Sequence, residues 1–233
     1  MSPFLEGGFD HHPTSIGIPP TPPFRPDSLS GLVLWIDARS LTGVVLNGGL
    51  VTTWPDMSGN GNDLASSGTA RPKYFDNTPT NAPVVRFRSP GTPSTYMSAL
   101  FTLDQPHTVA ARLDTTSLGG HSHVWDGNVA DVGDFETDVG NFVMEAGATL
   151  VGPPFAPING WHFFACFYDG ANSDMQLDGA SVASGNAGVF DPGGIVLGAS
   201  ATPGLHAKFD IAALYIFDRQ LTAIELSHLQ AYR

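Results

Sequence analysis

Short runs of β-branched, aromatic and aliphatic residues, separated by turn residues, recur along most of the chain and constrain its fold more than any other feature. No stretch of helical length lies between consecutive runs, which argues against alternating strand–helix units. Many short strands joined by glycine- and proline-rich turns are typical of a β-sandwich or barrel. We therefore predict an all-β fold with strands at 32–37, 50–54, 84–88, 96–100, 108–113, 124–126, 141–145, 161–168, 174–177, 195–197 and 209–217.

The strand at 161–168 and the turns that follow it are the most informative part of this pattern. Asp-Gly pairs at 169–170 and 178–179 flank a short strand, and such pairs typically reverse the chain between antiparallel strands, so we expect a meander. The strand itself has bulky apolar side chains on both faces, whereas a strand with one solvent-exposed face alternates apolar and polar residues. We expect its outer face to be covered by the N-terminal segment, a long loop or another subunit.

The composition is that of a folded, turn-rich protein without disulfide bonds. Hydrophobic residues make up 42% of the 233 residues, and there are 27 glycines and 19 prolines. A chain of this length buries about 70–75% of the surface that its unfolded form would expose. Cys166 is the single cysteine, so no disulfide forms within the chain, which fits synthesis in a reducing compartment.

The charge balance argues against several partners. The formal net charge is −12 at pH 7 and lysine and arginine are not clustered, so we expect no nucleic acid and no membrane as a partner. No apolar run approaches the roughly 20 residues that span a bilayer. Residues 1–12 lack the basic and apolar regions of a secretion signal, and we therefore expect synthesis in a cytoplasm.

Residues 1–30 form a proline-rich arm that differs from the sandwich predicted for 31–233. Proline fixes φ and removes a backbone donor, so this stretch is expected to be extended. Two interpretations stay open, a stiff spacer and an assembly arm that lies on its own sandwich or on a neighbouring chain. We favour the assembly arm because apolar side chains recur along it at Phe4, Leu5, Phe9, Ile16, Ile18 and Phe24.

The end of the chain has the pattern of a short helix. Thr222 and Glu225 have the spacing of a capping box. Leu226, Leu229 and Tyr232 follow as a narrow apolar stripe. We expect a C-terminal helix that packs against the sandwich.

Three groups of residues, in order along the chain, carry a resemblance to a known fold family. They are 31–37 (GLVLWID) with 54–62 (WPDMSGNGN), 161–170 with 177–179, and 195–198 with 209–222. Over about residues 31–230 the chain resembles the concanavalin A-like lectin/glucanase superfamily and, within it, the laminin G-like domains. The resemblance implies a jelly roll of two curved antiparallel sheets. That superfamily includes lectins, adhesive modules, glycan-cleaving enzymes and bacteriophage virion proteins.

Acidic residues between 126 and 138 are a candidate site. Asp134, Glu136 and Asp138 alternate, which could place three carboxylates on one strand face, and glycan hydrolysis uses such a pair. The segment lacks the spaced second glutamate of the family hydrolases and lies among glycines, so we favour a solvated acidic loop. A cation site formed with Asp126 and Asp131 is the alternative.

Asp56, Ser58 and Asn60 resemble the opening of a calcium loop, with oxygen ligands at alternate positions and a glycine directly after them. Ser67 stands where such a loop has its bidentate glutamate. Asn-Gly and Ser-Gly pairs also form ordinary turns. We favour a structural turn, keep calcium as the alternative, and predict no other cofactor.

Histidine pairs and tryptophans are the remaining candidates. His121 with His123, and His11 with His12, could chelate a transition metal, but no cysteine or third histidine stands at ligand spacing. We therefore favour exposed loop histidines. Trp125 is the tryptophan outside the structural motifs, so it is the candidate for stacking on a glycan.

Together these features predict a non-catalytic protein of a bacteriophage virion, either a head decoration or a tail or fibre component, anchored by its arm. Its partners would be other virion subunits or copies of itself, in a homo-oligomer or on a particle, and also host-surface glycans. It would be made in the host cytoplasm and lie on the virion exterior. The alternatives are a carbohydrate-binding, lectin-like module and a glycan-cleaving enzyme that acts through Glu136.

Overall fold

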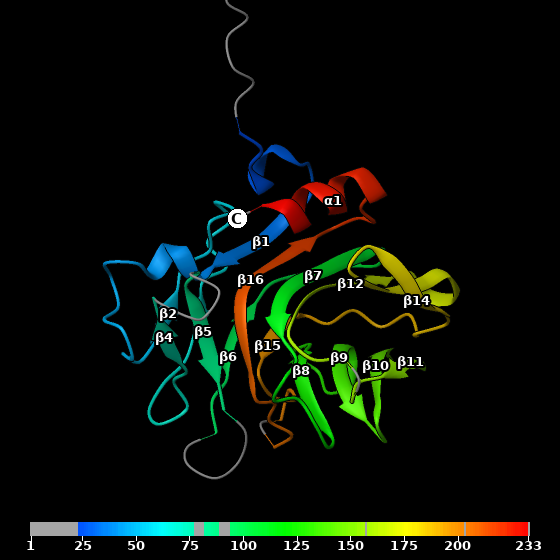
Figure 1. Cartoon of the computed structure of the whole chain (residues 1–233). Helices are drawn as coiled ribbons and strands as arrows, with labels where there is room; N and C mark the ends of the chain where they lie inside the picture. Colours follow the sequence, from blue (N-terminus) through cyan, green and yellow to red (C-terminus); the bar gives the residue numbers. More distant parts are fainter. Residues whose placement is uncertain (1–22, 77–81, 89–93, 157, 203, 233) are drawn as a thin grey trace, which may run out of the picture.

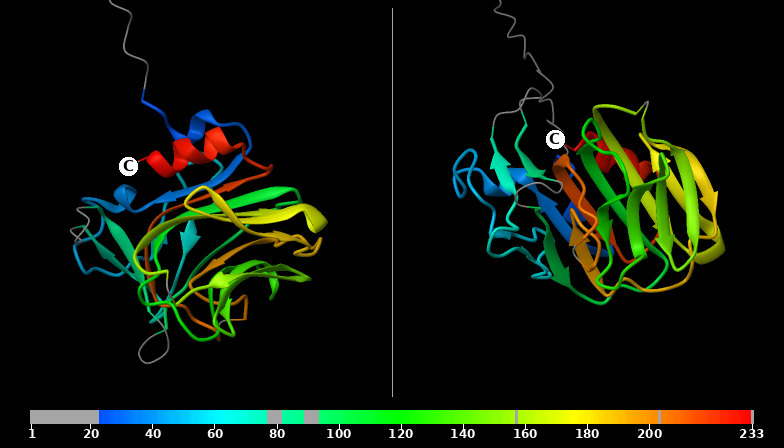
Figure 2. Two further views of the ribbon diagram at one scale, coloured as in Figure 1. Left: turned by 45° about the vertical axis from the view of Figure 1, so that its right-hand side comes forward. Right: turned by 90° about the horizontal axis from the view of Figure 1, so that it is seen from below.

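The computed structural model describes residues 23–76, 82–88, 94–156, 158–202 and 204–232. Within these ranges the strands form two eight-stranded antiparallel sheets that pack face to face, as Figures 1 and 2 show. The predicted two-sheet sandwich with a short C-terminal helix is confirmed. No helix in the described part of the chain has the length and apolar character needed to cross a membrane.

The two sheets are named A and B. In spatial order, sheet A contains β14 (Ala180–Gly185), β13 (Ser173–Leu177), β12 (Trp161–Tyr168), β7 (His107–Asp114), β16 (Phe209–Phe217), β5 (Val84–Phe87) and β4 (Lys73–Phe75), with β1 (Leu32–Asp37) also paired to β16. Sheet B contains β11 (Thr149–Pro154), β10 (Asn141–Ala146), β9 (Val132–Asp138), β8 (Ser122–Asp126), β15 (Gly194–Leu197), β6 (Met97–Leu100), β3 (Leu64–Ala65) and β2 (Thr53–Trp54). The predicted meander is confirmed as β12–β13–β14.

Strand β16 lies in the middle of sheet A and has three partners. On one side it pairs with β7 along nearly its whole length. On the other side, Phe209–Ile211 pair with β5 and Ala213–Phe217 pair with β1. Segments far apart in the sequence are therefore held together by this strand.

Aromatic side chains fill the space between the sheets. Phe164 on β12 has its ring centroid 4.9 Å from that of Phe135 and 5.0 Å from that of Phe142, which come from β9 and β10. Trp125 packs on Phe135 at 4.6 Å and donates its indole N–H to the Tyr168 hydroxyl at 3.4 Å. All five side chains are fully buried, so they link sheet A to sheet B.

A second apolar cluster covers the outer face of sheet A. The helix α1 (Ala223–Ala231) lies over β1 and β16 in Figure 2. Its Leu226 and Leu229 join Phe163 and Phe167 of β12 in this buried cluster. The second apolar face of β12 is therefore covered as predicted, but the cover is largely α1 and not the N-terminal segment, a long loop or another subunit that we expected.

Phe24 is the one predicted arm contact within the described residues. Its ring lies 5.1 Å from the His228 ring and 6.1 Å from the Tyr232 ring, on α1 and just beyond it. A 3-10 turn at Pro26–Ser28 then leads into β1, and two more 3-10 turns lie at Ala38–Leu41 and Gly170–Asn172. Phe24 thus contacts its own sandwich. The other predicted arm contacts lie outside the described residues: Phe4, Leu5, Phe9, Ile16 and Ile18.

The predicted capping box at the start of α1 is confirmed, and an ion pair extends it. The Thr222 hydroxyl accepts from the Glu225 N–H, and the Glu225 carboxylate accepts from the Thr222 N–H. Arg219 Nη2 lies 2.7 Å from Glu225 Oε1. The hydrogen bond from Arg219 lowers the pKa of Glu225 to about 2.

We expect Glu225→Gln to lower the free energy of unfolding by about 1–2 kcal/mol at pH 7, after allowance for solvent screening. Glutamine keeps the capping geometry and removes the charge. Because the pKa of Glu225 is depressed in the folded protein, its contribution is complete above pH 4.5 and is lost as the pH falls towards 2. Denaturant unfolding at pH 7 and pH 3 checks this; an equal cost at both pH values would contradict it.

Candidate functional site

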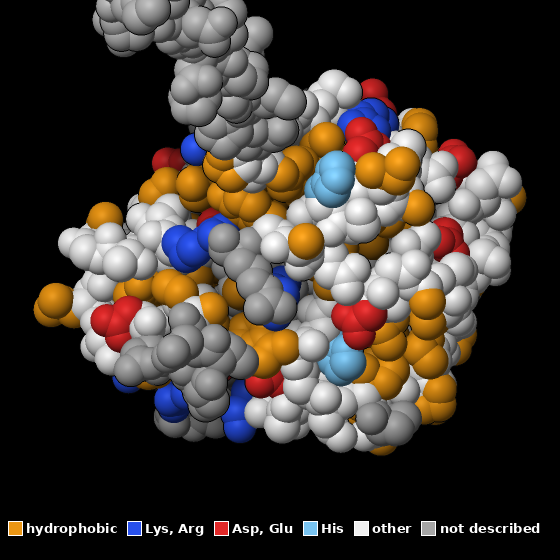
Figure 3. All heavy atoms as spheres, turned by 45° about the horizontal axis from the view of Figure 1, so that its top comes forward, with side chains coloured by type: hydrophobic (Ala, Val, Ile, Leu, Met, Phe, Trp, Pro, Cys, Tyr) orange, Lys and Arg blue, Asp and Glu red, His pale blue; other side chains and the backbone are white. Residues whose placement is uncertain are grey.

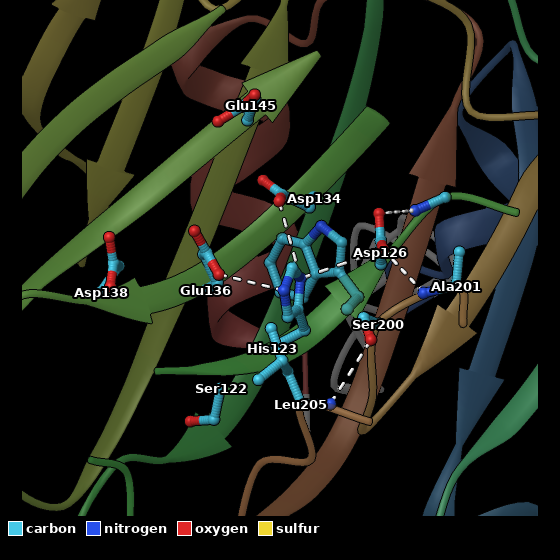
Figure 4. A network of polar contacts seen from close by, with 12 residues as sticks. Ser122, His123, Asp126, Asp134, Glu136, Asp138, Glu145, Ser200, Ala201 and Leu205 are labelled. Carbon is cyan, nitrogen blue, oxygen red and sulfur yellow. Dashed lines mark hydrogen bonds and ion pairs between the residues drawn. The ribbon is translucent and has the colours of Figure 1, made fainter. Parts of the chain in front are cut away.

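Each sheet carries one polar candidate site on its outer face, and the first is formed by β8 and β9. On β9, Phe135 points into the core, so Asp134 and Glu136 point to the opposite face. On β8, His123 pairs in register with Glu136. Figure 4 shows the resulting arrangement, with carboxylates placed around the His123 ring.

The His123 ring is the centre of this group. Its Nε2 lies 3.1 Å from Glu136 Oε2, and its Nδ1 lies 3.6 Å from Asp134 Oδ2 and 4.0 Å from Asp126 Oδ2. His121 brings its own Nε2 to 2.9 Å from the same Glu136 oxygen. We call these five residues the histidine–carboxylate cluster.

Burial dominates the electrostatics of the cluster. Loss of solvent lowers the pKa of His123 to about 4 and raises the pKa of Asp126 to about 6. It also raises the pKa of Glu136 to about 7 and the pKa of Asp134 well above its ordinary value, where the Glu136 and Asp126 charges add to the effect. Isolated charges are costly in such a place, so the cluster favours neutral groups or a compensating cation.

Two sets of groups in this region are close enough to hold one metal ion. One set is His121, His123 and Glu136; the other is His123, Asp131 and Asp134. Within each set, the potential ligand atoms lie within 4.8 Å of one another. The sequence prediction of a cation site among these acidic residues stays a prediction, and the structure adds the two histidines to it.

Two sequence predictions are wrong at this site. The segment with Asp134, Glu136 and Asp138 is strand β9 and not a solvated loop, and Asp134 is only 1% exposed. His123 is fully buried, not an exposed loop histidine, although the His121 side chain is 50% exposed. Hydrolysis requires two carboxyl groups at the scissile bond. The burial of Asp134 and Glu136 gives a sugar no access to them, which argues against the glycan-cleaving alternative.

The predicted calcium-loop residues form hydrogen bonds with the backbone of β1. The Asp56 carboxylate accepts from the backbone N–H groups of Trp35 and Ser58, and Ser58 also donates its hydroxyl to that carboxylate. The Asn60 amide donates to the carbonyl of Val33 at 3.0 Å. These bonds fit the structural turn that we favoured, and calcium at Asp56, Ser58 and Asn60 stays an untested alternative.

The second candidate site is a cleft of about 250 Å³ on the outer face of sheet A, beside the end of α1. Figure 3 views the molecule from the side of this helix and shows Lys and Arg side chains among hydrophobic ones. The cleft is lined by residues from β1, β7, β12, β16 and α1 and the turns next to them. The larger side chains in the lining are Arg39, Arg112, Trp161, Tyr215, Leu229 and Tyr232.

The two arginines of the cleft differ in their partners. Arg39 donates through Nε to Asp37 at 2.9 Å, and its guanidinium lies 4.5 Å from the centre of the Tyr232 ring. Arg112 lies on the outer face of β7, and no residue of the described ranges forms a hydrogen bond or ion pair with its guanidinium. The cleft therefore offers one cation whose donors are available to a ligand, with Trp161 and Tyr215 beside it.

Trp125, the predicted glycan contact, is a core residue. Its side chain is fully buried between Phe135 and Tyr168, so a sugar cannot stack on it and the prediction is wrong. The half-exposed tryptophan is Trp161, which we had assigned to a structural motif. The sequence did contain one signal for this cleft. Arg112 is an isolated cation on an apolar strand of an acidic chain.

Comparison with known proteins shows the class of fold. No protein-family model matches the chain, and no curated protein matches it. Among solved structures, the binding domain of Paraclostridial Mosquitocidal Protein 1 aligns with a TM-score of 0.60 and 12% identity, over 88% of this chain and 52% of its own. The binding domain of botulinum neurotoxin serotype C1 aligns with a TM-score of 0.62 and 11% identity, over 89% and 53%.

A Trypanosoma rangeli sialidase, solved in complex with sialic acid, also aligns, with a TM-score of 0.56 and 16% identity over 86% of this chain and 33% of its own. The chain thus spans about half the length of the toxin binding domains and a third of the sialidase. At these identities the likeness shows the fold alone. The chain is a two-sheet β-sandwich, a fold that it shares with these binding domains and with part of the sialidase.

Proposed function

We propose that this protein is a non-catalytic binding module that holds an acidic saccharide in the cleft on sheet A. The observation that carries the proposal is that the half-buried rings of Trp161 and Tyr232 line a cleft with Arg112, a cation without a partner among the described residues, in a chain with a net charge of −12. Ligand sites in proteins are typically apolar and aromatic pockets with a few convergent polar groups.

The chemistry of the cleft indicates a ligand with a carboxylate and a flat apolar face. A guanidinium presents paired donors that match a carboxylate, and charge-assisted hydrogen bonds of this kind are strong. Trp161 is half-buried and supplies a ring face and an indole N–H, whereas Tyr215 lines the cleft but is only 2% exposed and offers no ring face. Asp37, the acidic group in the lining, is already paired with Arg39 and would not repel the ligand. A sugar acid meets all of these requirements.

The structural neighbours support a binding role over catalysis. The toxin structures are binding domains, and one neighbouring structure is described as showing that cell entry of botulinum neurotoxin type C depends on interaction with two ganglioside molecules. Membership of the concanavalin A-like superfamily, with a laminin G-like fold, is part of this proposal. The virion role, its subunit partners and its exterior location stay predictions from the sequence, and the neighbours favour the glycan-binding alternative.

Arg112→Gln is expected to weaken binding of an acidic glycan about 10–100-fold, because a charge-assisted hydrogen bond contributes about 1.5–3 kcal/mol. Trp161→Ala should weaken it as well through the lost ring contact. The measurement is a glycan array that includes sialylated and uronic-acid glycans, followed by calorimetry on the best ligand.

Arg71→Gln is the matched control, because Arg71 is partly exposed like Arg112, donates to the Gly68 carbonyl and takes no part in the cleft lining. Its affinity should equal that of the wild type. The proposal fails if the array shows no acidic glycan, or if the ligand found binds equally well to the Arg112 and Arg71 variants.

A further inference from the structure

His121, His123 and Glu136 bring three metal-binding atoms to one point on the outer face of sheet B. His121 directly precedes β8 and His123 is the second residue of that strand, and residues two apart along an extended segment point to the same face. Glu136 lies directly opposite His123 on β9. Its Oε2 is 2.9 Å from His121 Nε2 and 3.1 Å from His123 Nε2.

Buried groups without hydrogen bonds make this more than a collection of acidic residues. Among the described residues, neither Asp134 oxygen and neither His123 ring nitrogen has a hydrogen-bond partner, although both side chains are at most 1% exposed. Buried polar side chains in proteins are nearly always hydrogen-bonded, and buried charges are paired or bind metals. Figure 4 shows both groups directed into the cluster.

The groups around each histidine are those that surround metal-binding imidazoles, although the outer nitrogen–carboxylate contacts are longer than hydrogen bonds. A ligating imidazole binds the ion through one nitrogen and directs the other to a carboxylate, which fixes the orientation of the ring. Here His123 Nδ1 faces Asp134 Oδ2 at 3.6 Å, and His121 Nδ1 faces Asp138 Oδ1 at 3.8 Å. Both Nε2 atoms face Glu136. Each ring therefore has a carboxylate on its far side and a shared ligand point on its near side.

We propose that His121, His123 and Glu136 bind a divalent transition-metal ion of the zinc class, with Asp134 and Asp138 orienting the two imidazoles. Imidazole nitrogens with one carboxylate suit zinc rather than calcium, which takes six to eight oxygen ligands. Ligand atoms about 2.0–2.1 Å from a tetrahedral ion lie about 3.3–3.4 Å from one another. The observed separations from Glu136 are a few tenths of an ångström shorter. The half-exposed His121 side leaves a path for the ion and a position for a fourth ligand.

This site lies on sheet B and is independent of the glycan cleft on sheet A, so either proposal can fail alone. The test uses the full chain, stripped with a chelator and dialysed, and titrated with zinc chloride by calorimetry at pH 7.5. We expect one zinc ion per chain and a rise in the midpoint of thermal unfolding. Cobalt(II) in place of zinc should give the visible absorption of a tetrahedral site with nitrogen and oxygen ligands.

Four variants test whether zinc binding depends on the proposed site. His121→Ala removes a half-exposed ligand and should weaken zinc binding at least about 10-fold, while Asp134→Asn should weaken it about 10–100-fold as the loss of an orienting partner does. His162→Ala is the matched control, because His162 pairs with Asp178 on sheet A. A double variant, His11→Ala with His12→Ala, should also bind like the wild type.

The proposal is overturned by any of three outcomes: no zinc binding, zinc binding that survives His121→Ala, or loss of binding in the His11 and His12 double variant. Calcium binding in the absence of zinc binding would be one form of the first outcome. Thermal unfolding of each variant in the presence of the chelator establishes that it is folded. Because the His121 side chain is 50% exposed, this variant should match the wild type in that control.

Discussion

Phe164→Ala is expected to lower the free energy of unfolding by about 3–5 kcal/mol, the range for removal of a buried phenylalanine ring. The Phe164 ring is fully buried on sheet A and lies within 5.0 Å of Phe135 and Phe142 on sheet B, measured between centroids. Its removal leaves a cavity between two stiff sheets that cannot collapse to fill it. Urea unfolding followed by tryptophan fluorescence measures the loss.

Phe190→Ala is the matched control, because the same ring is removed from a side chain that is 58% exposed. We expect it to cost about 1 kcal/mol or less, since little apolar surface returns to water. Equal costs for the two variants would mean that Phe164 does not connect the sheets as described.

The protein is expected to lose about 3 kcal/mol of stability through His107 alone as the pH falls from 6.5 to 4. His107 is fully buried on β7, its ring stacks on Tyr168 at 4.8 Å, and its Nε2 has no hydrogen-bond partner among the described residues. Burial lowers its pKa to about 4. Below pH 6.5 His107 is protonated in the unfolded chain, whereas in the folded protein it stays neutral down to about pH 4. The free energy of unfolding therefore decreases as the pH falls.

The comparison of wild type with His107→Phe isolates this effect. The variant keeps an aromatic ring and cannot take up the proton, so its stability relative to the wild type should rise by about 1.4 kcal/mol per pH unit over that interval. The carboxyl groups with raised pKa values act in the opposite direction, and they cancel in the difference. Val109→Ala, a core substitution on the same strand without a titratable group, should show a constant difference. A flat difference for His107→Phe would contradict the assignment.

The fold could be predicted because turn chemistry marks most strand ends. The strands β1, β12 and β16 lie at the predicted residues, since their β-branched and aromatic content leaves few alternatives. Sequence reasoning missed β3, β4, β9 and β11. β3 and β4 are two and three residues long, β11 ends in a pair of prolines, and β9 carries acidic side chains that usually favour loops.

The candidate sites were harder to predict than the fold, because burial depends on tertiary structure. An alternating acidic segment looks solvated in sequence, and only the tertiary structure buries Asp134 and His123. The two tryptophans show the same limit. Trp125 follows Val124 and Trp161 follows Gly160, but the depth of each ring is decided by the other sheet and by α1. The predicted alternation of carboxylates on one strand face was confirmed. The burial of these carboxylates could not be predicted from the local sequence.

The position of β16 has a consequence for how the protein is made. On a ribosome, β1, β5 and β7 emerge well before the strand with which all three pair. Until residues 209–217 leave the exit tunnel, these strands have open edges that could join other nascent chains. Sheet A can therefore be completed only after β16 has been made, and the yield of folded protein should depend on chaperones that protect the open edges until then.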